Sequence, residues 1–373
     1  MTWRAATLKD LVVFQRGFDI TKAAQEDGDV PVISSSGITS FHSEAKLPGP
    51  GVIVGRKGTL GTVHYSEGPY WPHDTTLWSK ELNGNDPKYV YYFLQTLGLE
   101  RYNVGNANPT LNRNHIHDLD ISIPPTPAQR RIGEILSTYD DLIANNRRRI
   151  QLLEQSARLL YKEWFVHLRF PGHEHVKVVD GVPKGWRKDR LNEVAAINAV
   201  TLSNRFHGEI EYIDIASVTP GQINGTTRYS FEDAPGRARR VVRHGDIIWS
   251  CVRPNRESHA VIWNPPEDLI ASTGFAVISP TGLPTSYLYQ TLTTREFVGF
   301  LSNNAKGVAY PAVTARNFED YRVLVPPSHM LNRYDEQIRP TLDLISVLNA
   351  QIRRLISARD LLLPRLMSGE IEV

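Results

Sequence analysis

Residues 132–164 read IGEILSTYDDLIANNRRRIQLLEQSARLLYKEW, and this stretch decides the fold. Positions taken three and four apart in alternation hold Leu136, Tyr139, Ile143, Asn146, Ile150, Leu153, Ala157, Leu160 and Trp164. Eight of these nine side chains are apolar or aromatic, which is the heptad pattern of a helix that packs against another helix. We call such a row of heptad positions a seam. A helix over residues 127–164 would be about 57 Å long, at about 1.5 Å per residue.

The same spacing recurs 202 residues further along the chain. The corresponding positions hold Ile338, Thr341, Ile345, Leu348, Ile352, Leu355, Arg359, Leu362 and Leu366, of which seven are apolar. A second long helix is therefore predicted. Because a proline lacks the backbone N–H of a helix interior, Pro340 is expected to begin or kink this helix and to make it the shorter of the two.

Two matched seams in one chain predict that the helices pair with each other as an antiparallel coiled coil. The residues expected to make this pairing are Leu136, Tyr139, Ile143, Asn146, Ile150, Leu153, Leu160, Ile345, Leu348, Ile352, Leu355 and Leu362. Asn146 is interpreted as a polar side chain that disfavours misaligned pairings, or as simple tolerance near a solvent-exposed end. In the alternative packing, each helix lies on its own β domain. Trp164, Phe165 and Leu168 flank the seam and are expected to be exposed.

The chain outside these helices also occurs twice. Each copy opens with a Trp-Arg pair, at Trp3 and Trp186, and closes with a short strand that ends in two prolines. Between these points, runs of β-branched and aromatic residues are broken by Gly and Pro, which is typical of short strands and turns. The predicted fold class is α+β, with two mainly β domains, each followed by a long helix, in a pseudo-twofold internal repeat. The predicted boundaries are 1–125 for the first β domain, 126–168 for the first helix, 169–185 for a linker, 186–327 for the second β domain and 328–373 for the second helix.

Composition excludes several classes of protein. The 373 residues are 41% hydrophobic and 22% charged, which is typical of folded domains rather than of disorder. The single cysteine, Cys251, cannot form an internal disulfide and is predicted to be buried in a strand rather than to act as a nucleophile. No apolar run approaches the ~18 residues that cross a bilayer, and the first residues lack the apolar run of a signal peptide. We therefore expect a cytoplasmic protein without a membrane partner.

The order of these parts resembles the specificity subunits of Type I restriction-modification systems. The segments that carry the resemblance are GRKGTLG at 55–61, PPTPAQRRI at 124–132 and LLLPRLMSGEI at 361–371. The resemblance covers the whole chain and implies that each β domain is a target recognition domain for one half of a split, asymmetric sequence in double-stranded DNA. It further implies that the paired helices set the gap between the halves and dock methylation subunits, expected to number two, with restriction subunits in the full complex.

By the same resemblance, the chain is expected to be non-catalytic and to bind no cofactor itself. S-adenosylmethionine would be used by a partner adenine-N6 methyltransferase. ATP and Mg would be used by the partner subunits that translocate and cleave DNA.

A DNA-binding surface needs cations for phosphates and amide or guanidinium groups for base edges. From Arg228 to Arg256 the sequence holds seven arginines against three acids, and Gly58 lets the backbone beside Lys57 approach a phosphate. Asn-rich stretches suit both turns and adenine edges, and a charged run also suits a solvated face. The candidate DNA contacts are Ser35, Arg56, Lys57, Thr59, Asn106, Asn108, Asn112, Arg239, Arg240, Arg253, Asn255, Arg256, Lys306, Tyr310 and Arg316.

Other functions have weaker support in the sequence. The NPPE at residues 264–267 differs by one residue from the Asn-Pro-Pro-aromatic motif of amino-methyltransferases, and a glutamate cannot stack on a flipped base. The pairs His115/His117 and His173/His175 lack a third clustered ligand, so no metal site is predicted. The competing hypothesis is a protein-interaction adaptor that carries two β domains on paired helices. An enzyme hidden in one β domain is the weaker third possibility.

Overall fold

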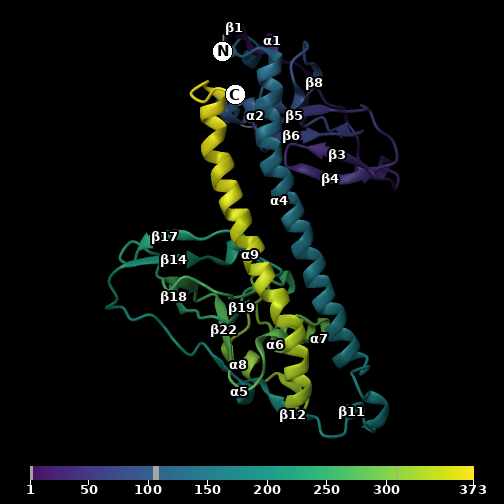
Figure 1. Ribbon diagram of the computed structural model, residues 1–373, viewed down its shortest axis with the longest axis vertical. Helices are drawn as coiled ribbons and strands as arrows, with labels where there is room; N and C mark the ends of the chain where they lie inside the picture. Colours follow the sequence, from purple (N-terminus) through teal and green to yellow (C-terminus); the bar gives the residue numbers. More distant parts are fainter. Residues whose placement is uncertain (1–2, 104–108, 308) are drawn as a thin grey trace. The chain divides into compact units, whose positions relative to one another are not determined.

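The computed structural model describes residues 3–103, 109–307 and 309–373. The two longest helices in these ranges are α4 (Thr126–Tyr161) and α9 (Ser328–Met367). The chain divides into two compact units, which we call unit 1 (residues 1–146 with 351–373) and unit 2 (residues 147–350). The boundary between them falls inside both long helices, so each unit contains one β-rich domain and a part of each helix (Figure 1).

Unit 1 contains the first β-rich domain. Its shorter elements are β1 (Arg4–Thr7), α1 (Leu8–Leu11), β2 (Val13–Arg16), β3 (Val30–Ser34), β4 (Gly37–His42), β5 (Gly51–Gly55), β6 (Val63–Ser66), β7 (Trp71–Pro72), β8 (Thr76–Glu81), α2 (Pro87–Thr96), α3 (Arg113–His117) and β9 (Asp120–Ile123), with 3₁₀ turns at Lys22–Ala24 and Leu99–Tyr102. An antiparallel sheet has the order β2-β8-β5-β6, a second sheet has the order β4-β3-β7, and β1 pairs with β9.

The core of unit 1 lies between its four-stranded sheet and the helices. All five residues of β5 are buried, as expected for an uninterrupted small and apolar strand. The helix α2 begins at Pro87, after Asp86 accepts a hydrogen bond from the amide of Tyr89, and it packs Tyr89 into the core. Leu136 of α4 and Leu366 of α9 join the same core (Figure 1).

Unit 2 contains the second β-rich domain. Its shorter elements are β10 (Val178–Val179), β11 (Val182–Pro183), β12 (Arg187–Arg190), α5 (Leu191–Val194), β13 (Ala195–Ile197), β14 (Glu209–Ile213), β15 (Val218–Thr219), β16 (Gln222–Ile223), β17 (Thr227–Ser230), β18 (Ala238–Val241), β19 (Ile247–Ser250), β20 (His259–Val261), β21 (Leu269–Ser272), β22 (Phe275–Pro280), α6 (Thr285–Thr291), α7 (Arg295–Asn304), α8 (Ala315–Glu319) and β23 (Arg322–Val325), with a π-helical turn at Lys162–Val166 and 3₁₀ turns at His173–His175, Ile215–Ser217 and Pro254–Arg256.

The sheets of unit 2 repeat the plan of unit 1. The antiparallel sheet β13-β22-β19-β20 corresponds strand for strand to β2-β8-β5-β6, and β12 pairs with β23 as β1 pairs with β9. The second sheet, β17-β14-β21-β18, has a parallel pair β14/β21 where unit 1 has the parallel pair β3/β7. The internal repeat predicted from the sequence is therefore present in the sheet topology, with extra strands in unit 2.

The two long helices contact each other within each unit. In unit 1, Asp140 pairs with Arg359 and Asn146 pairs with Gln351, so the partner's number falls as the position on α4 rises. In unit 2, the hydroxyl of Tyr334 donates a hydrogen bond of 3.4 Å to the carbonyl of Ala157. The helix parts run antiparallel in unit 1, as the seams predict. A continuous coiled coil through the unit boundary stays a prediction.

All twelve residues expected to pair the helices are buried or half-buried. The buried ones are Leu136, Ile143, Asn146, Ile150, Leu348 and Ile352, and the half-buried ones are Tyr139, Leu153, Leu160, Ile345, Leu355 and Leu362. Several of them also pack on the β domains, since Leu136 and Leu362 join the core of unit 1. The two alternative packings are thus combined, because each seam is broad enough to meet both a helix and a sheet.

Two expectations about the helices were wrong. The helix α9 begins at Ser328, where its predicted range begins, and runs through Pro340 rather than starting there. With 40 residues it is longer than α4, which has 36. Trp164 and Phe165 are buried rather than exposed, because the π-helical turn after α4 directs them into an aromatic core with Tyr334. Leu168 is half-buried against that core.

Within the described ranges, no helix combines the length and the apolar character that crossing a membrane requires.

Candidate nucleic-acid interface

The loop that follows the buried central strand meets a second loop in each unit. In unit 1, the amide of Leu111 donates to the carbonyl of Arg56 at 2.9 Å, and Lys57 forms a bridge with Thr110. In unit 2, the amide of Val313 donates to the carbonyl of Cys251 at 2.8 Å. Leu111 and Val313 are 202 residues apart, as are the seams. The repeat therefore builds the same loop pair twice, and both pairs carry candidate DNA contacts.

The loop pair of unit 1 presents Lys57 and Thr59, which are exposed. Arg56 is half-buried, and its Nη1 is buried without a hydrogen-bond partner. Burial, followed by repulsion from Arg16, lowers the pKa of Arg56. A buried guanidinium nitrogen without a partner is unfavourable, so a nearby anion such as a phosphate would stabilise it.

Two other candidates of unit 1 have structural roles. Ser35 is 7% exposed, and its carbonyl accepts hydrogen bonds from Thr62 and His64, which fixes the turn beneath the loop. The side chain of Asn112 caps α3 by accepting from the amide of Asn114 at 3.0 Å. Asn106 and Asn108 lie outside the described residues.

The loop pair of unit 2 gathers five candidates. Asn255, Arg256, Lys306 and Tyr310 are exposed, and Arg253 is half-buried. The amide of Arg253 donates to the carbonyl of Pro311 at 2.7 Å, so the two loops are joined at this residue. The sequence could not reveal this meeting, because more than 50 residues separate Arg253 from Tyr310.

The remaining arginine candidates are held by protein groups. Arg239 lies 4.5 Å from the ring centre of Phe231, and Nη1 of Arg240 donates to Thr201 at 3.2 Å. Arg316 is exposed and lies 3.6 Å from Asp320 on the same helix. Arginines that form one cluster in the sequence thus divide into strand residues of the second sheet and loop residues around Arg256. Whether each contacts DNA stays a prediction.

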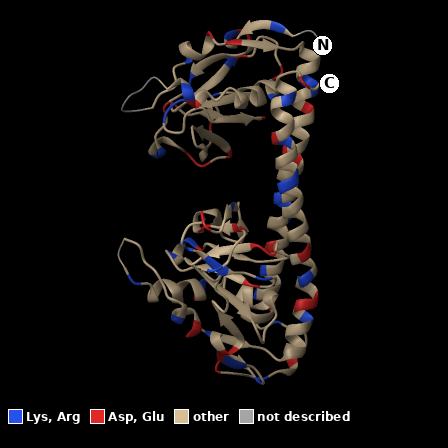
Figure 2. Ribbon diagram, turned by 90° about the vertical axis from the view of Figure 1, so that its left-hand side faces the viewer, with Lys and Arg blue, Asp and Glu red and all other residues tan. Residues whose placement is uncertain are grey.

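Figure 2 shows Lys and Arg interspersed with Asp and Glu in each unit. In that view the Lys and Arg positions are scattered over several elements rather than gathered on one. This agrees with the net charge of +2 for the whole chain. Recognition would then depend on the loop pairs and not on overall charge.

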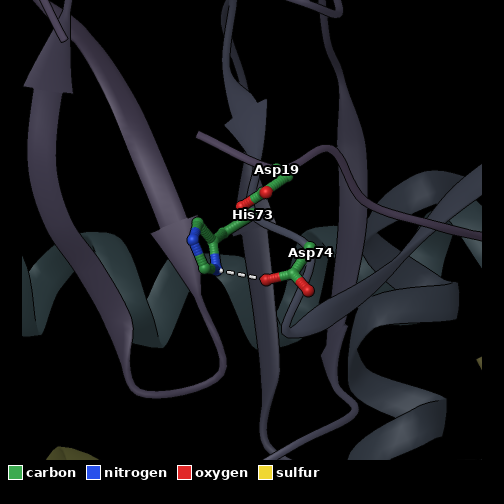
Figure 3. Close-up of side chains that lie close together, drawn as sticks. All are labelled: Asp19, His73 and Asp74. Carbon is green, nitrogen blue, oxygen red and sulfur yellow. Dashed lines mark ion pairs between the residues drawn. The ribbon is translucent and has the colours of Figure 1, made fainter. Parts of the chain in front are cut away.

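Asp19, His73 and Asp74 come together in unit 1 (Figure 3). This group could not be predicted from the sequence, because 54 residues separate Asp19 from His73. One possible ligand atom from each lies within 4.8 Å of the others. Oδ1 of Asp74 is 3.2 Å from Nδ1 of His73, and its Oδ2 is 2.9 Å from Arg16. The arginine already balances Asp74, so the group is explained as an ion-pair network beside the loop pair.

The histidines and the cysteine that the sequence singled out have structural partners. Nε2 of His117 accepts a hydrogen bond of 3.0 Å from the amide of Phe14, which holds that ring neutral, and burial lowers its pKa. His173 lies 2.8 Å from the carbonyl of Phe170. Cys251 follows β19 directly and is half-buried, and burial raises the pKa of its thiol to about 11. A thiolate nucleophile at neutral pH is therefore disfavoured.

Comparisons with known proteins point to one family. Residues 1–155 match the family model of the Type I restriction modification DNA specificity domain. The chain is 25% identical over 338 residues to the Type I restriction enzyme MjaIX specificity subunit of Methanocaldococcus jannaschii, which covers 86% of this chain and 78% of that relative. It is 24% identical over 179 residues to the HindI specificity subunit of Haemophilus influenzae, covering 45% of this chain and 38% of the relative.

A solved structure shares the fold of the whole chain. The crystal structure of the Type I restriction-modification S subunit from M. genitalium superposes with a TM-score of 0.64 and covers 98% of this chain and 96% of that one. The identity between the two is 14%, so this likeness concerns the fold.

A β domain that occurs twice with the same basic loop pair, together with two long helices, defines a two-domain DNA-binding protein. The chain is similar to the specificity subunits of Type I restriction-modification systems in the family model that residues 1–155 match, in these relatives and in its fold.

Proposed function

We propose that unit 1 and unit 2 each recognise one half of a split DNA target through their loop pairs. The observation that carries the proposal is the backbone hydrogen bond that joins the two loops of each pair in the same way, with different side chains on each pair. Lys57 and Thr59 are exposed on the first pair, whereas Asn255, Arg256 and Tyr310 are exposed on the second. Two loop pairs with a similar backbone but different side chains would read two half-sites of different sequence, because side chains that contact base edges determine the specificity.

The long helices would set the separation between the half-sites. They are continuous through the boundary between the units, and a continuous helix fixes length at about 1.5 Å per residue. The predicted consequence is a spacer of constant length between the two halves of the target.

The helices would also dock methylation subunits, and duplicated exposed leucines support two docking positions. Leu142 and Leu344 are 45% and 37% exposed, and Leu159 and Leu361 are 63% and 71% exposed. Each pair is related by the repeat spacing of 202 residues. Unit 1 holds Leu142 and Leu361, and unit 2 holds Leu159 and Leu344, so each unit has one exposed leucine from each helix. Exposed leucines in equivalent places favour two copies of one partner.

In this proposal the chain holds no cofactor of its own. The methylation subunits would transfer a methyl group from S-adenosylmethionine to N6 of adenine. Restriction subunits would use ATP and Mg to translocate and cleave unmethylated DNA.

The test of half-site recognition is single-molecule methylome sequencing of cells that express this chain with its neighbouring methylation subunit. Cells lacking only this chain are the control. We expect a split adenine-methylated motif that requires the chain and that changes in one half when residues 1–125 are exchanged for those of another specificity subunit. Methylation that does not depend on the chain would contradict the proposal.

The adaptor hypothesis predicts a different result in a binding assay. A DNA-binding chain loses affinity steeply as salt rises, because each phosphate contact releases counterions. An adaptor that binds proteins would show no such slope with duplex DNA.

The docking proposal has a test of its own. Glutamate at Leu142 and Leu361 together should reduce the complex from two methylation subunits to one, and glutamate at Leu159 and Leu344 should do the same for the second position. Native mass spectrometry counts the subunits. Arg148→Glu on the same helix is a matched exposed control.

A further inference from the structure

Tyr310 is a large aromatic residue that is 70% exposed in the loop pair of unit 2. The base of its loop is closed by two reciprocal hydrogen bonds of 2.9 Å between the backbones of Lys306 and Ala312. Gly307 has φ of 101°, which side chains rarely adopt, and a Cβ there would lie 3.0 Å from the carbonyl of Tyr310. The exposed ring therefore projects from a loop whose ends are fixed.

Arg253 holds one face of this ring. Its guanidinium carbon lies 4.6 Å from the ring centre, and its Nη2 donates to the carbonyl of Ala309 at 3.4 Å. The backbone of Arg253 has φ of 49°, and that of Glu257 has φ of 54°, so two left-handed residues enclose the turn at Pro254–Arg256. Such conformations are strained in residues other than glycine, and this strain is unusual without a function for the loop.

The guanidinium of Arg253 is already engaged, which changes how this residue should act. A cation that stacks on a ring and donates to a carbonyl is less available for a phosphate or a base edge. The opposite face of the Tyr310 ring is left for an external group. The neighbouring exposed Arg256 and Lys306 supply the positive charge that a phosphate backbone attracts.

We propose that Tyr310 stacks on a base of the DNA half-site bound by unit 2, and that Arg253 is the positioning residue that orients the ring. This inference rests on the proposed function of unit 2. A base offers a flat π-face to the ring, and such stacking is tolerant of sequence. At the repeat spacing of 202 residues, the first copy has Asn108, which lies outside the described residues. The ring is thus particular to the second half-site.

The experiment uses the complex of the full chain with its methylation subunits and a duplex that carries the motif found by methylome sequencing. 2-Aminopurine replaces one purine at a time across the second half-site. A ring that stacks on a base and separates it from its neighbour raises the fluorescence at that position. We expect such a signal at one position with the wild type and with Tyr310→Phe, and none with Tyr310→Ala.

Affinity separates stacking from charge. Tyr310→Ala should weaken binding by about 5- to 150-fold without changing the salt slope, because the ring carries no charge. The matched variant Lys306→Ala should reduce the salt slope by about 1 and keep the fluorescence signal. Arg253→Ala should lower the fluorescence at the same position, because it removes the group that orients the ring.

Each outcome decides between the two proposals. If the wild-type complex prefers the motif over random duplex, but no position gives a fluorescence signal and Tyr310→Ala binds within about twofold of wild type, the stacking role is overturned and half-site recognition stands. If the wild-type complex does not prefer the motif, half-site recognition fails and the stacking role fails with it. The wild-type signal does not depend on the folding of any variant.

Discussion

Nδ2 of Asn146 donates a hydrogen bond of 3.3 Å to Oε1 of Gln351, which joins the amide in the seam of α4 to α9. Asn146 is 7% exposed, whereas Gln351 is exposed. The buried amide thus has a partner across the helix pair. This contact supports the interpretation of Asn146 as a residue that fixes the register, because a shifted pairing would leave its amide among apolar side chains.

Replacing this amide should stabilise the chain. In Asn146→Leu a buried polar group gives way to an apolar one, and the exposed Gln351 can bond with water, so we expect a gain of about 1 kcal/mol. The urea concentration at the unfolding midpoint measures this gain in stability. Asn145→Leu, at an exposed position of the same helix, is the control and should change little. A lower midpoint for Asn146→Leu would show that the hydrogen bond outweighs apolar packing.

A second polar contact explains the charged residue of the second seam. Arg359 Nη1 lies 2.5 Å from Asp140, whose other oxygen accepts from the hydroxyl of Tyr92. Asp140→Ala leaves both partners without this acceptor, and we expect a loss of about 1 to 3 kcal/mol. In the background of Arg359→Met, the same change should have a smaller effect. Equal losses in both backgrounds, in a double-mutant cycle of unfolding free energies, would contradict the coupling.

Glu154 of α4 makes stability depend on pH. Burial raises its pKa from 4.5 to about 7, although Arg158 opposes this, and its Oε1 lies against Gly221 of the β domain. The native state therefore keeps a proton that the unfolded chain loses, so the contribution of Glu154 to stability is complete below about pH 4.5 and falls as pH rises through 7. Glu154→Gln should abolish this fall and be more stable than wild type at pH 8, by on the order of 1 to 3 kcal/mol. The unfolding midpoints of the wild type and of Glu154→Gln are compared from about pH 4.5 to 8. Midpoints that change with pH in the same way in both proteins would contradict this role of Glu154.

His259 acts in the opposite direction. Burial lowers its pKa from 6.5 to about 4, and Arg158 lowers it further, while Nδ1 lies 3.1 Å from the hydroxyl of Tyr289. The native ring stays neutral where the unfolded chain takes up a proton, so this contribution is complete above pH 6.5 and is lost as pH falls toward 4. In Glu154→Gln, where the opposing dependence is gone, stability should fall between pH 6.5 and 4.5. The imidazole NMR shift of His259 should not change above about pH 5, and a midpoint near 6.5 would disprove the burial argument.

The sequence predicted what depends on local periodicity. The seam from Leu136 to Leu160 was predicted correctly, because a helical repeat is visible in neighbouring residues. Pro340 was expected to begin or kink α9, but the helix continues through it, because the packing of Tyr334 and Leu331 holds the preceding helical turns in place. Tertiary packing overrode a local preference there.

The candidate site was predicted less completely than the fold. Charge and composition singled out Lys57, Arg253 and Tyr310 as candidates, but the meeting of the two loops within each unit depends on long-range pairing. Arg239 is a candidate whose partner was not foreseen. It lies in a basic run of the sequence, but its guanidinium packs over the ring of Phe231. Such partners are set by sheet register, which a single sequence does not display.

The pairing of the first and last strands of each β domain has an evolutionary consequence. Arg4 lies opposite Ile123, and Arg187 lies opposite Val325, so the chain enters and leaves each domain at adjacent points. A domain of different length can replace the original if it keeps this two-stranded clasp, because α4 starts only three residues after β9. Gene recombination between the codons of the clasp would then create a new target preference in one event, with the helices inherited unchanged.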